Sequence, residues 1–200
     1  MGKIIQSFFC LIAAFLLVAS PALAEECKPV LYDAAKFEAG DRVPELGDNP
    51  KIAVGQDKDT RYFTGEHINF SMPATAVEQI EVLADFHEDK ETIFQLFAAS
   101  KADTPAITFH QDYQHLWVID GGKKKDRKDE SYYHYKKPNS YRFVFRKGTI
   151  RVFLNQEYIG SVEAGKQFAR LTINSLNDRD KIFSVAISPN CNATPSPSSQ

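Results

Sequence analysis

The stretch YRFVFRKGTIRVFLNQEYIGSV, residues 141–162, decides the fold of this chain. Apolar and polar residues alternate over its first six residues and again from Thr149 to Leu154, which is the period of a strand with one buried face. Lys147-Gly148 supplies a tight turn between these runs, because glycine reaches positive φ without a Cβ clash. Asn155 also tolerates the left-handed region, so Asn155-Gln156-Glu157 turns the chain again. The stretch therefore predicts three adjacent antiparallel strands.

Short strands of the same kind are expected along the rest of the chain. Alternating or β-branched runs recur at a spacing of about ten residues, with turn residues between them. This pattern predicts an all-β sandwich. The further candidate strands are residues 62–70, 78–86, 92–98, 106–110, 115–120, 169–174 and 182–188.

One segment leaves an alternative open. Residues 74–102 are rich in Ala, Glu, Gln and Leu, and some of their apolar side chains are spaced to share a helical face. A helix near residues 75–100 would make the fold α+β. Glu88-Asp89-Lys90, however, is a good polar turn between two runs of strand length, so we expect strand, turn and strand here.

The first 24 residues have the features of a secretory signal peptide. Lys3 precedes an apolar run, which ends at Ser20-Pro21 just before the small-residue site Ala22-Leu23-Ala24. We expect cleavage at this site and a secreted or periplasmic mature chain. No other segment of the sequence has the length and apolarity of a membrane span.

The mature chain is expected to be a single domain over residues 25–191, because the 176 residues that remain fit one core better than two small ones. Residues 192–200 are small, polar and rich in proline, which predicts a disordered tail. Asn192-Ala193-Thr194 within this tail matches the N-glycosylation pattern.

The net charge of the mature chain excludes one class of partner. Without Lys3 the chain carries 23 basic against 26 acidic side chains, a net charge of −3. This balance gives no electrostatic attraction to polynucleotides or anionic membranes. We therefore expect no nucleic-acid partner.

Two cysteines, Cys27 and Cys191, remain near the ends of the mature chain. In an oxidising compartment the simplest expectation is that they form a disulfide. A catalytic or metal-binding thiol pair is disfavoured, because the sequence has no CxxC spacing and no histidine near either cysteine. We expect the disulfide to join the first and last strands.

The meander of residues 141–162 resembles the C-terminal region of concanavalin A-like lectin/glucanase and laminin-G-like sandwiches. There a strand, a glycine turn, a strand ending in Asn-Gly and an Ile-Gly return follow one another, although Gln156 stands in the glycine's place here. VLADFHEDKETIFQLF, residues 82–97, also resembles paired strands of that superfamily. The resemblance covers about residues 60–188 and implies a two-sheet antiparallel jelly-roll sandwich whose concave face often holds a saccharide. It leads to our first hypothesis, a lectin-like module that binds a polysaccharide or glycan.

A saccharide site needs an aromatic platform and a few planar polar groups. Trp117 lies in an expected strand, and Tyr133 and Tyr135 follow the charged residues 121–130, which we expect to form a solvated loop. Together with Arg142 these are the candidate ligand-binding residues. A core role for Trp117 and a packing role for the tyrosines stay open.

A polysaccharide lyase that cleaves uronic-acid polymers by β-elimination is the enzymatic alternative. This reaction needs a base and a polar group that neutralises the sugar carboxylate. The alginate-lyase-like families carry a Gln-Ile-His strand, and Gln95-Leu96-Phe97 aligns with it, with Phe97 in the histidine's place. The candidate catalytic residues of this alternative are Gln95, His87 and His110. The sequence leaves open whether the chain is an enzyme.

No cofactor is expected. Asp57 and Asp59, and likewise Asp178 and Asp180, leave calcium as the metal to consider, but isolated Asp-x-Asp pairs lack the ligand series of a calcium loop. A third hypothesis is a non-catalytic interaction protein of the cell envelope. The oligomeric state is not determined by the sequence.

Overall fold

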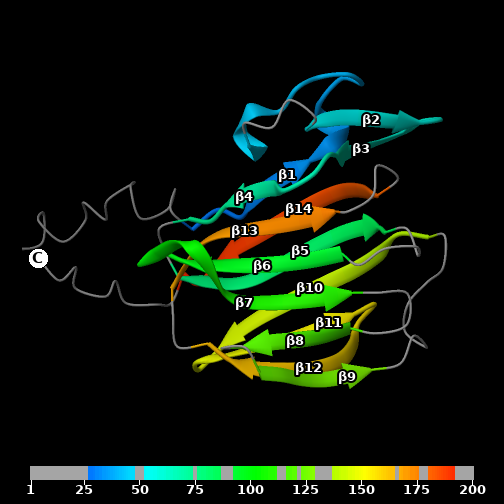
Figure 1. Cartoon of the computed structure of the whole chain (residues 1–200). Helices are drawn as coiled ribbons and strands as arrows, with labels where there is room; N and C mark the ends of the chain where they lie inside the picture. The colour runs from blue at the N-terminus through cyan, green and yellow to red at the C-terminus, as the bar shows by residue number, and fades with distance from the viewer. Residues whose placement is uncertain are drawn as a thin grey trace, which may run out of the picture.

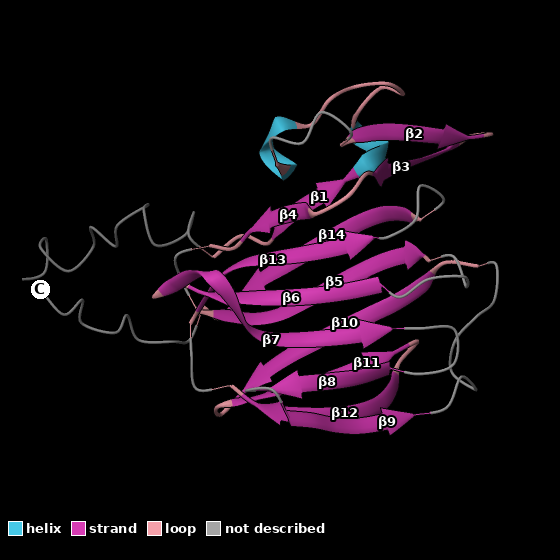
Figure 2. Cartoon of the chain, in the orientation of Figure 1, coloured by secondary structure: helices cyan, strands magenta, loops and turns pink. Residues whose placement is uncertain are grey.

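Two antiparallel sheets stack face to face in this protein (Figure 1), with strands making up nearly all of its regular structure (Figure 2). The structure, a computed structural model, describes residues 27–47, 52–73, 76–86, 92–111, 116–120, 123–128, 137–164, 167–175 and 180–191. The expected all-β, two-sheet antiparallel sandwich is confirmed.

The larger sheet has the strand order β12-β11-β10-β5-β14-β3-β2, with β1 also paired to β14. Two short 3-10 helices, η1 (Ala34–Lys36) and η2 (Pro44–Leu46), lie between β1 and β2. The strands of this sheet are β1 (Val30–Asp33), β2 (Ala53–Asp57), β3 (Thr60–Thr64), β5 (Val77–Asp85), β10 (Asn139–Arg146), β11 (Thr149–Leu154), β12 (Glu157–Glu163) and β14 (Lys181–Pro189).

The smaller sheet has the order β4-β13-β6-β7-β8-β9. In Figure 1 it lies in front of the larger sheet. Its strands are β4 (Ile68–Ser71), β6 (Thr92–Ala98), β7 (Lys101–Gln111), β8 (Leu116–Asp120), β9 (Lys123–Lys128) and β13 (Phe168–Ser175).

The core lies between the sheets and is rich in aromatic rings. Phe94 of β6 and Phe109 of β7 contact Phe143 of β10, with ring centroids 5.5 and 4.8 Å apart. Phe94 also lies 5.1 Å from the ring of Tyr141, and these four side chains are at most 1% exposed. Burial of one such ring stabilises the fold by about 1.5–3 kcal/mol, so this cluster is a major part of what holds the sheets together.

The predicted meander is confirmed in register. β10 pairs with β11 from Tyr141↔Leu154 to Arg146↔Thr149, and β11 pairs with β12. Both turns have positive φ at their two central residues. The values are 47° at Lys147 and 76° at Gly148 in the first turn, and 49° at Asn155 and 76° at Gln156 in the second. Two left-handed residues match the right-handed twist of the flanking strands, so these two-residue turns direct each strand back onto its neighbour.

Asn155 does more than permit a turn. Its Oδ1 accepts a hydrogen bond from the backbone N–H of Ser140 (3.0 Å), and its Nδ2 donates to Oδ1 of Asn139 (2.7 Å). Asn139 is fully buried and donates through Nδ2 to the carbonyl of Lys137 (3.0 Å). The two amides therefore join the β11–β12 turn to the start of β10.

The consecutive strands β5 and β6 lie in opposite sheets. β5 pairs with β10 and β14, whereas β6 pairs with β13 and β7. The expected strands are confirmed and the helical alternative is wrong for the described residues, but the expected pairing of these two strands is wrong. Each strand buries one apolar face, and the two faces meet across the core rather than side by side.

Residues 123–128 are a strand, so the loop predicted over residues 121–130 is wrong for these six residues. β9 pairs with β8, for example Val118↔Lys125. The backbone bonds of this ladder do not depend on the polarity of the side chains. β9 is the last strand of its sheet, and lysine is a favoured residue on such edges because it discourages pairing with another chain.

The two ends of the described chain lie together. β1 pairs with β14 (Val30↔Ile187), which confirms that the first and last strands are neighbours. Cys27 and Cys191 are thiols in the structure, with Sγ of Cys191 3.5 Å from the carbonyl oxygen of Cys27. The disulfide itself stays a prediction.

Several expectations fall outside the described residues, namely the signal peptide, the tail and the glycosylation pattern at Asn192. Where the structure does describe the chain, it contains no helix with the length and apolarity required to span a membrane.

Candidate functional site

A row of uncharged polar side chains crosses the outer face of the smaller sheet. Phe94 and Leu96 of β6 are buried in the core, so Gln95 between them faces outward. Gln95 is in register with Thr172 of β13 on one side and Thr108 of β7 on the other. Thr172 is in turn opposite Asn69 of β4, which extends the row over four strands.

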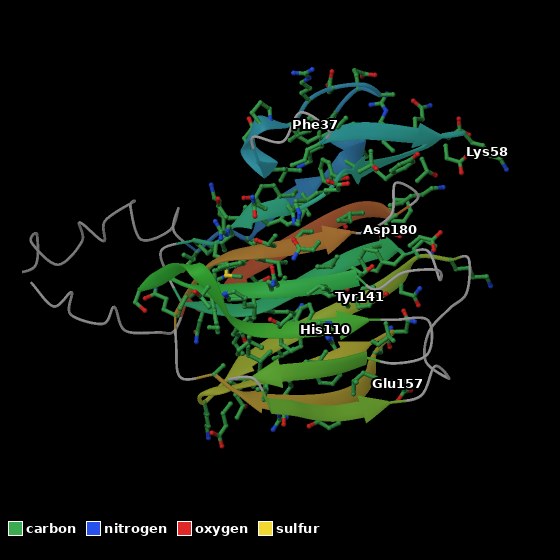
Figure 3. The ribbon with its side chains drawn as sticks, in the orientation of Figure 1. Phe37, Lys58, His110, Tyr141, Glu157 and Asp180 are labelled. Carbon is green, nitrogen blue, oxygen red and sulfur yellow. The ribbon has the colours of Figure 1, made fainter. Side chains whose placement is uncertain are left out.

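A second row runs beside the first. Asn174 of β13 is in register with Ile93 of β6, and Ile93 is in register with His110 of β7. His110 is labelled on this sheet in Figure 3. The backbone of Trp117 in β8 is in register with His110. His67, which immediately precedes β4, joins this row through Asn174.

Hydrogen bonds orient the amides of these rows. The carbonyl oxygen Oδ1 of Asn174 lies 2.7 Å from Nδ1 of His67, and because that oxygen only accepts, the imidazole nitrogen donates. Nδ2 of Asn174 donates to Oε1 of Gln95 (2.7 Å). Within the described residues Nε2 of Gln95 then has no acceptor, so its two N–H groups are held in a defined direction for an external one.

The same face also carries a planar guanidinium, that of Arg170, stacked on the ring of Phe97. The two residues are in register on β13 and β6, and the guanidinium carbon Cζ lies 4.1 Å from the centroid of the Phe97 ring. Phe97 is only 7% exposed although it faces away from the core, because the guanidinium covers its ring. Thr172 beside Arg170 donates through Oγ1 to Oδ1 of Asn69 (2.7 Å).

The predicted site residues divide between the two sheets. Gln95, His110 and the backbone of Trp117 come together on the smaller sheet. Arg142 lies on β10, on the outer face of the larger sheet, because Tyr141 and Phe143 on either side of it are buried in the core. A single site therefore does not contain both Trp117 and Arg142. His87, Tyr133 and Tyr135 lie outside the described residues.

Sequence reasoning missed the polar partners of Gln95. His67, Asn69, Thr172 and Asn174 come from segments up to 107 residues apart, and only the strand register brings them together. One signal was present in the sequence. Thr172 and Asn174 alternate with Leu171 and Ile173, which marks a strand with an uncharged polar outer face.

In the part of the chain that the structure describes, no three His, Cys, Asp or Glu side chains gather as a metal site would require. Asp57, one of the acids considered for calcium, instead accepts a hydrogen bond from Nζ of Lys181 at 3.0 Å. Asp178 lies outside the described residues.

A scan against protein-family models finds no match, and a search of the curated proteins also finds none. Solved structures do match. A Bacteroides ovatus GH16 protein of a mixed-linkage glucan locus, in complex with a G4G4G3G product, has a TM-score of 0.54 at 11% identity, covering 82% of this chain and 95% of that one.

Two further solved structures share the architecture. A tetrameric galectin from the ball sponge Cinachyrella sp. has a TM-score of 0.51 at 8% identity, covering 61% of this chain and 99% of its own. A sialidase has a TM-score of 0.55 at 8% identity, and the match covers 80% of this chain but only 18% of the sialidase. At these identities the likeness is one of fold, and this chain has the fold of a concanavalin A-like jelly-roll sandwich.

Proposed function

We propose that this chain is a carbohydrate-binding module that uses the outer face of the smaller sheet. The observation that carries the proposal is the oriented amide of Gln95 within a row of uncharged polar side chains. Sugar hydroxyls both donate and accept, so they are recognised by planar groups with a fixed direction. The Arg170–Phe97 pair adds a flat surface beside these groups.

Neutral glucan oligosaccharides are the first ligands to test. The GH16 protein of the same fold is bound to a product of mixed-linkage glucan. The face on this chain is built mainly of amide and hydroxyl groups rather than cations, which favours a neutral sugar over an acidic one.

The proposal includes a secreted or periplasmic location. It is supported by the signal-peptide features of the first 24 residues and by the proximity of Cys27 and Cys191, a pair suited to an oxidising compartment.

Titration of the purified chain with mixed-linkage glucan oligosaccharides tests the proposal. Isothermal titration calorimetry measures the affinity. Gln95→Ala should weaken binding by about tenfold, since one lost hydrogen bond corresponds to about 1–1.5 kcal/mol.

Gln56→Ala is the matched control, because Gln56 is an exposed glutamine on β2 of the other sheet. It should bind as the unaltered chain does. Absence of binding across a broad panel of neutral glycans would contradict the proposal, as would equal binding by Gln95→Ala.

A second candidate function is the lyase. It is favoured by one observation, that Gln95 and His110 share the same outer face on neighbouring strands. In this reaction the amide of Gln95 would donate a hydrogen bond to the uronate carboxylate and His110 would accept the C5 proton. The C4–O bond would break as the C4=C5 double bond forms, and the leaving oxygen would take a proton from solvent. Uronate polymers should then yield an unsaturated, ultraviolet-absorbing product that His110→Ala does not form. No such absorbance on a panel of uronate polymers removes this candidate and leaves binding alone.

A further inference from the structure

The outer face of the larger sheet carries a cluster of a cation and two aromatic rings. Arg142 of β10 is in register with Phe153 of β11, and Phe153 is in register with Tyr158 of β12. Cζ of Arg142 lies 4.6 Å from the centroid of the Phe153 ring. The rings of Phe153 and Tyr158 meet edge to face, with centroids 5.7 Å apart, and Tyr158 is 51% exposed.

The guanidinium of Arg142 is positioned but not neutralised. Glu81 is opposite Arg142 in the register of β5 and β10, but its Oε1 accepts a hydrogen bond from Oγ of Ser140 (2.8 Å). Among the described residues no carboxylate forms an ion pair with Arg142 and no acceptor binds its N–H groups. Stacking on Phe153 limits the orientations of the guanidinium plane, so its donors are directed before any ligand arrives.

We propose that Arg142, Phe153 and Tyr158 form a second ligand site, which takes the carboxylate of an acidic saccharide such as a uronate residue. The guanidinium binds the carboxylate through two parallel N–H···O bonds. The exposed ring of Tyr158 lies against the apolar face of the sugar ring. Arg151, exposed on the same face of β11 two residues before Phe153, adds positive charge.

The position on the fold favours a saccharide over a peptide strand. The cluster lies on the face of the sheet, over β10, β11 and β12, and Arg142 and Phe153 belong to strands that are paired on both sides. A peptide strand would need free backbone groups at an edge, whereas a sugar ring needs a flat aromatic surface and a polar group beside it. This site is independent of the neutral-sugar face proposed above, because it stands on different residues of the other sheet.

The test is a calorimetric titration of the purified chain with an oligouronate, and with the same oligosaccharide after its carboxylates have been reduced to alcohols. We expect the oligouronate to bind and the reduced form to bind at least tenfold more weakly. Arg142→Gln should weaken oligouronate binding by tenfold or more, since a hydrogen bond to a charged group contributes more than a neutral one.

Three variants separate recognition from packing. Arg142→Lys keeps the charge but not the planar fork, so it should recover only part of the affinity. Tyr158→Ala should weaken binding, and Tyr158→Phe should retain it, because the ring rather than the hydroxyl makes the contact. Glu81→Gln should tighten binding, because it removes the negative charge opposite Arg142.

Lys36→Gln is the charge-matched control, since Lys36 is an exposed cation of η1 at the other end of the sheet. Equal binding by Arg142→Gln and the unaltered chain would overturn the proposal. The proposal would also be overturned if Gln95→Ala lost oligouronate binding while Arg142→Gln kept it, because the acidic sugar would then bind on the smaller sheet. Oligouronate binding that depends on Arg142, in a chain that binds no neutral glycan, would support this site while contradicting the neutral-sugar face.

Discussion

The two ends of the larger sheet are built in different ways. At one end, β10, β11 and β12 follow one another in the chain, and two-residue turns set their register. Toward the other end, β14 pairs with three strands that are distant from it in sequence, β1, β3 and β5. Val30 of β1, for example, is paired with Ile187. The meander end is encoded locally, whereas the β14 end is held by contacts that only the complete fold creates.

The largest expected effect concerns the β14 end. Cys27 and Cys191 are 164 residues apart in sequence, and oxidation to a disulfide should raise the free energy of unfolding. For so long a loop the chain-entropy model gives about 5 kcal/mol, less any strain in the folded state. Thiol titration of the purified chain, followed by denaturant unfolding with and without reductant, measures the effect.

Cys27→Ser is the control for the disulfide and should unfold identically in both conditions. Two reactive thiols that persist in the folded chain after oxidation would show that the β14 end is held by strand pairing alone.

Removal of an amide at the meander end should have the next largest effect. Asn139→Ala removes two hydrogen bonds, one with Nδ2 of Asn155 and one with the carbonyl of Lys137, and empties a fully buried position. We expect a loss of about 2–3 kcal/mol in the free energy of unfolding, because each hydrogen bond contributes about 1 kcal/mol and truncation of a buried side chain also loses packing. Thermal or denaturant unfolding checks this value. A loss below about 0.5 kcal/mol would mean that the amide pair does not define the turn.

The same turn should also accept a stabilising change. Gln156 is exposed and has a φ of 76°, a conformation that costs less for glycine than for a residue with a side chain. Gln156→Gly should raise the free energy of unfolding by about 0.5–1 kcal/mol, after allowance for the greater freedom of glycine in the unfolded chain. Gln56→Gly on β2, where the backbone is extended, should be destabilising in the same assay.

The smallest expected effect is a pH dependence at the β14 end. The hydrogen bond from Lys181 lowers the pKa of Asp57, and the same bond raises the pKa of Lys181. The Asp57 contribution is therefore present above the usual carboxyl pKa and is lost as the pH falls through the lowered one. The Lys181 contribution is present below the usual lysine pKa and is lost as the pH rises through the raised one.

Asp57→Asn should reduce the dependence of stability on pH at both the acidic and the basic end. The change should be small because the pair is largely solvent-accessible. Melting temperatures from about pH 3 to pH 11 measure the profile. Asp59→Asn, which alters a neighbouring exposed carboxylate, should leave it unchanged. A profile of Asp57→Asn that matches that of the unaltered chain would contradict the assignment.

The same contrast explains what could be predicted from the sequence. The meander was predictable because Lys147-Gly148 and Asn155 carry their turn chemistry in adjacent residues. The sheet assignment of β5 and β6 was not, because alternation indicates which face of a strand is buried and not which sheet the strand joins. β9 was missed because its lysines indicate solvent exposure, which an edge strand also has.

The candidate site was predictable only in part, for the same reason. Gln95 and His110 lie on neighbouring strands, so both were found near one another in the sequence and in the fold. Asn174 and His67 are distant in sequence and meet Gln95 only through the pairing of β13 with β6 and β4. Arg142 was grouped with Trp117 by residue type, but the chain passes to the other sheet between them.

The central place of β14 has a consequence for the order of events during biogenesis. Residues 181–189 are the last of the described strands in chain order, and they separate β5 from β3 in the larger sheet. Without them that sheet is divided into one fragment of β12, β11, β10 and β5 and one of β3 and β2, and β1 has lost the strand with which it pairs. A nascent chain therefore cannot complete this sheet until residues 181–189 have left the ribosome.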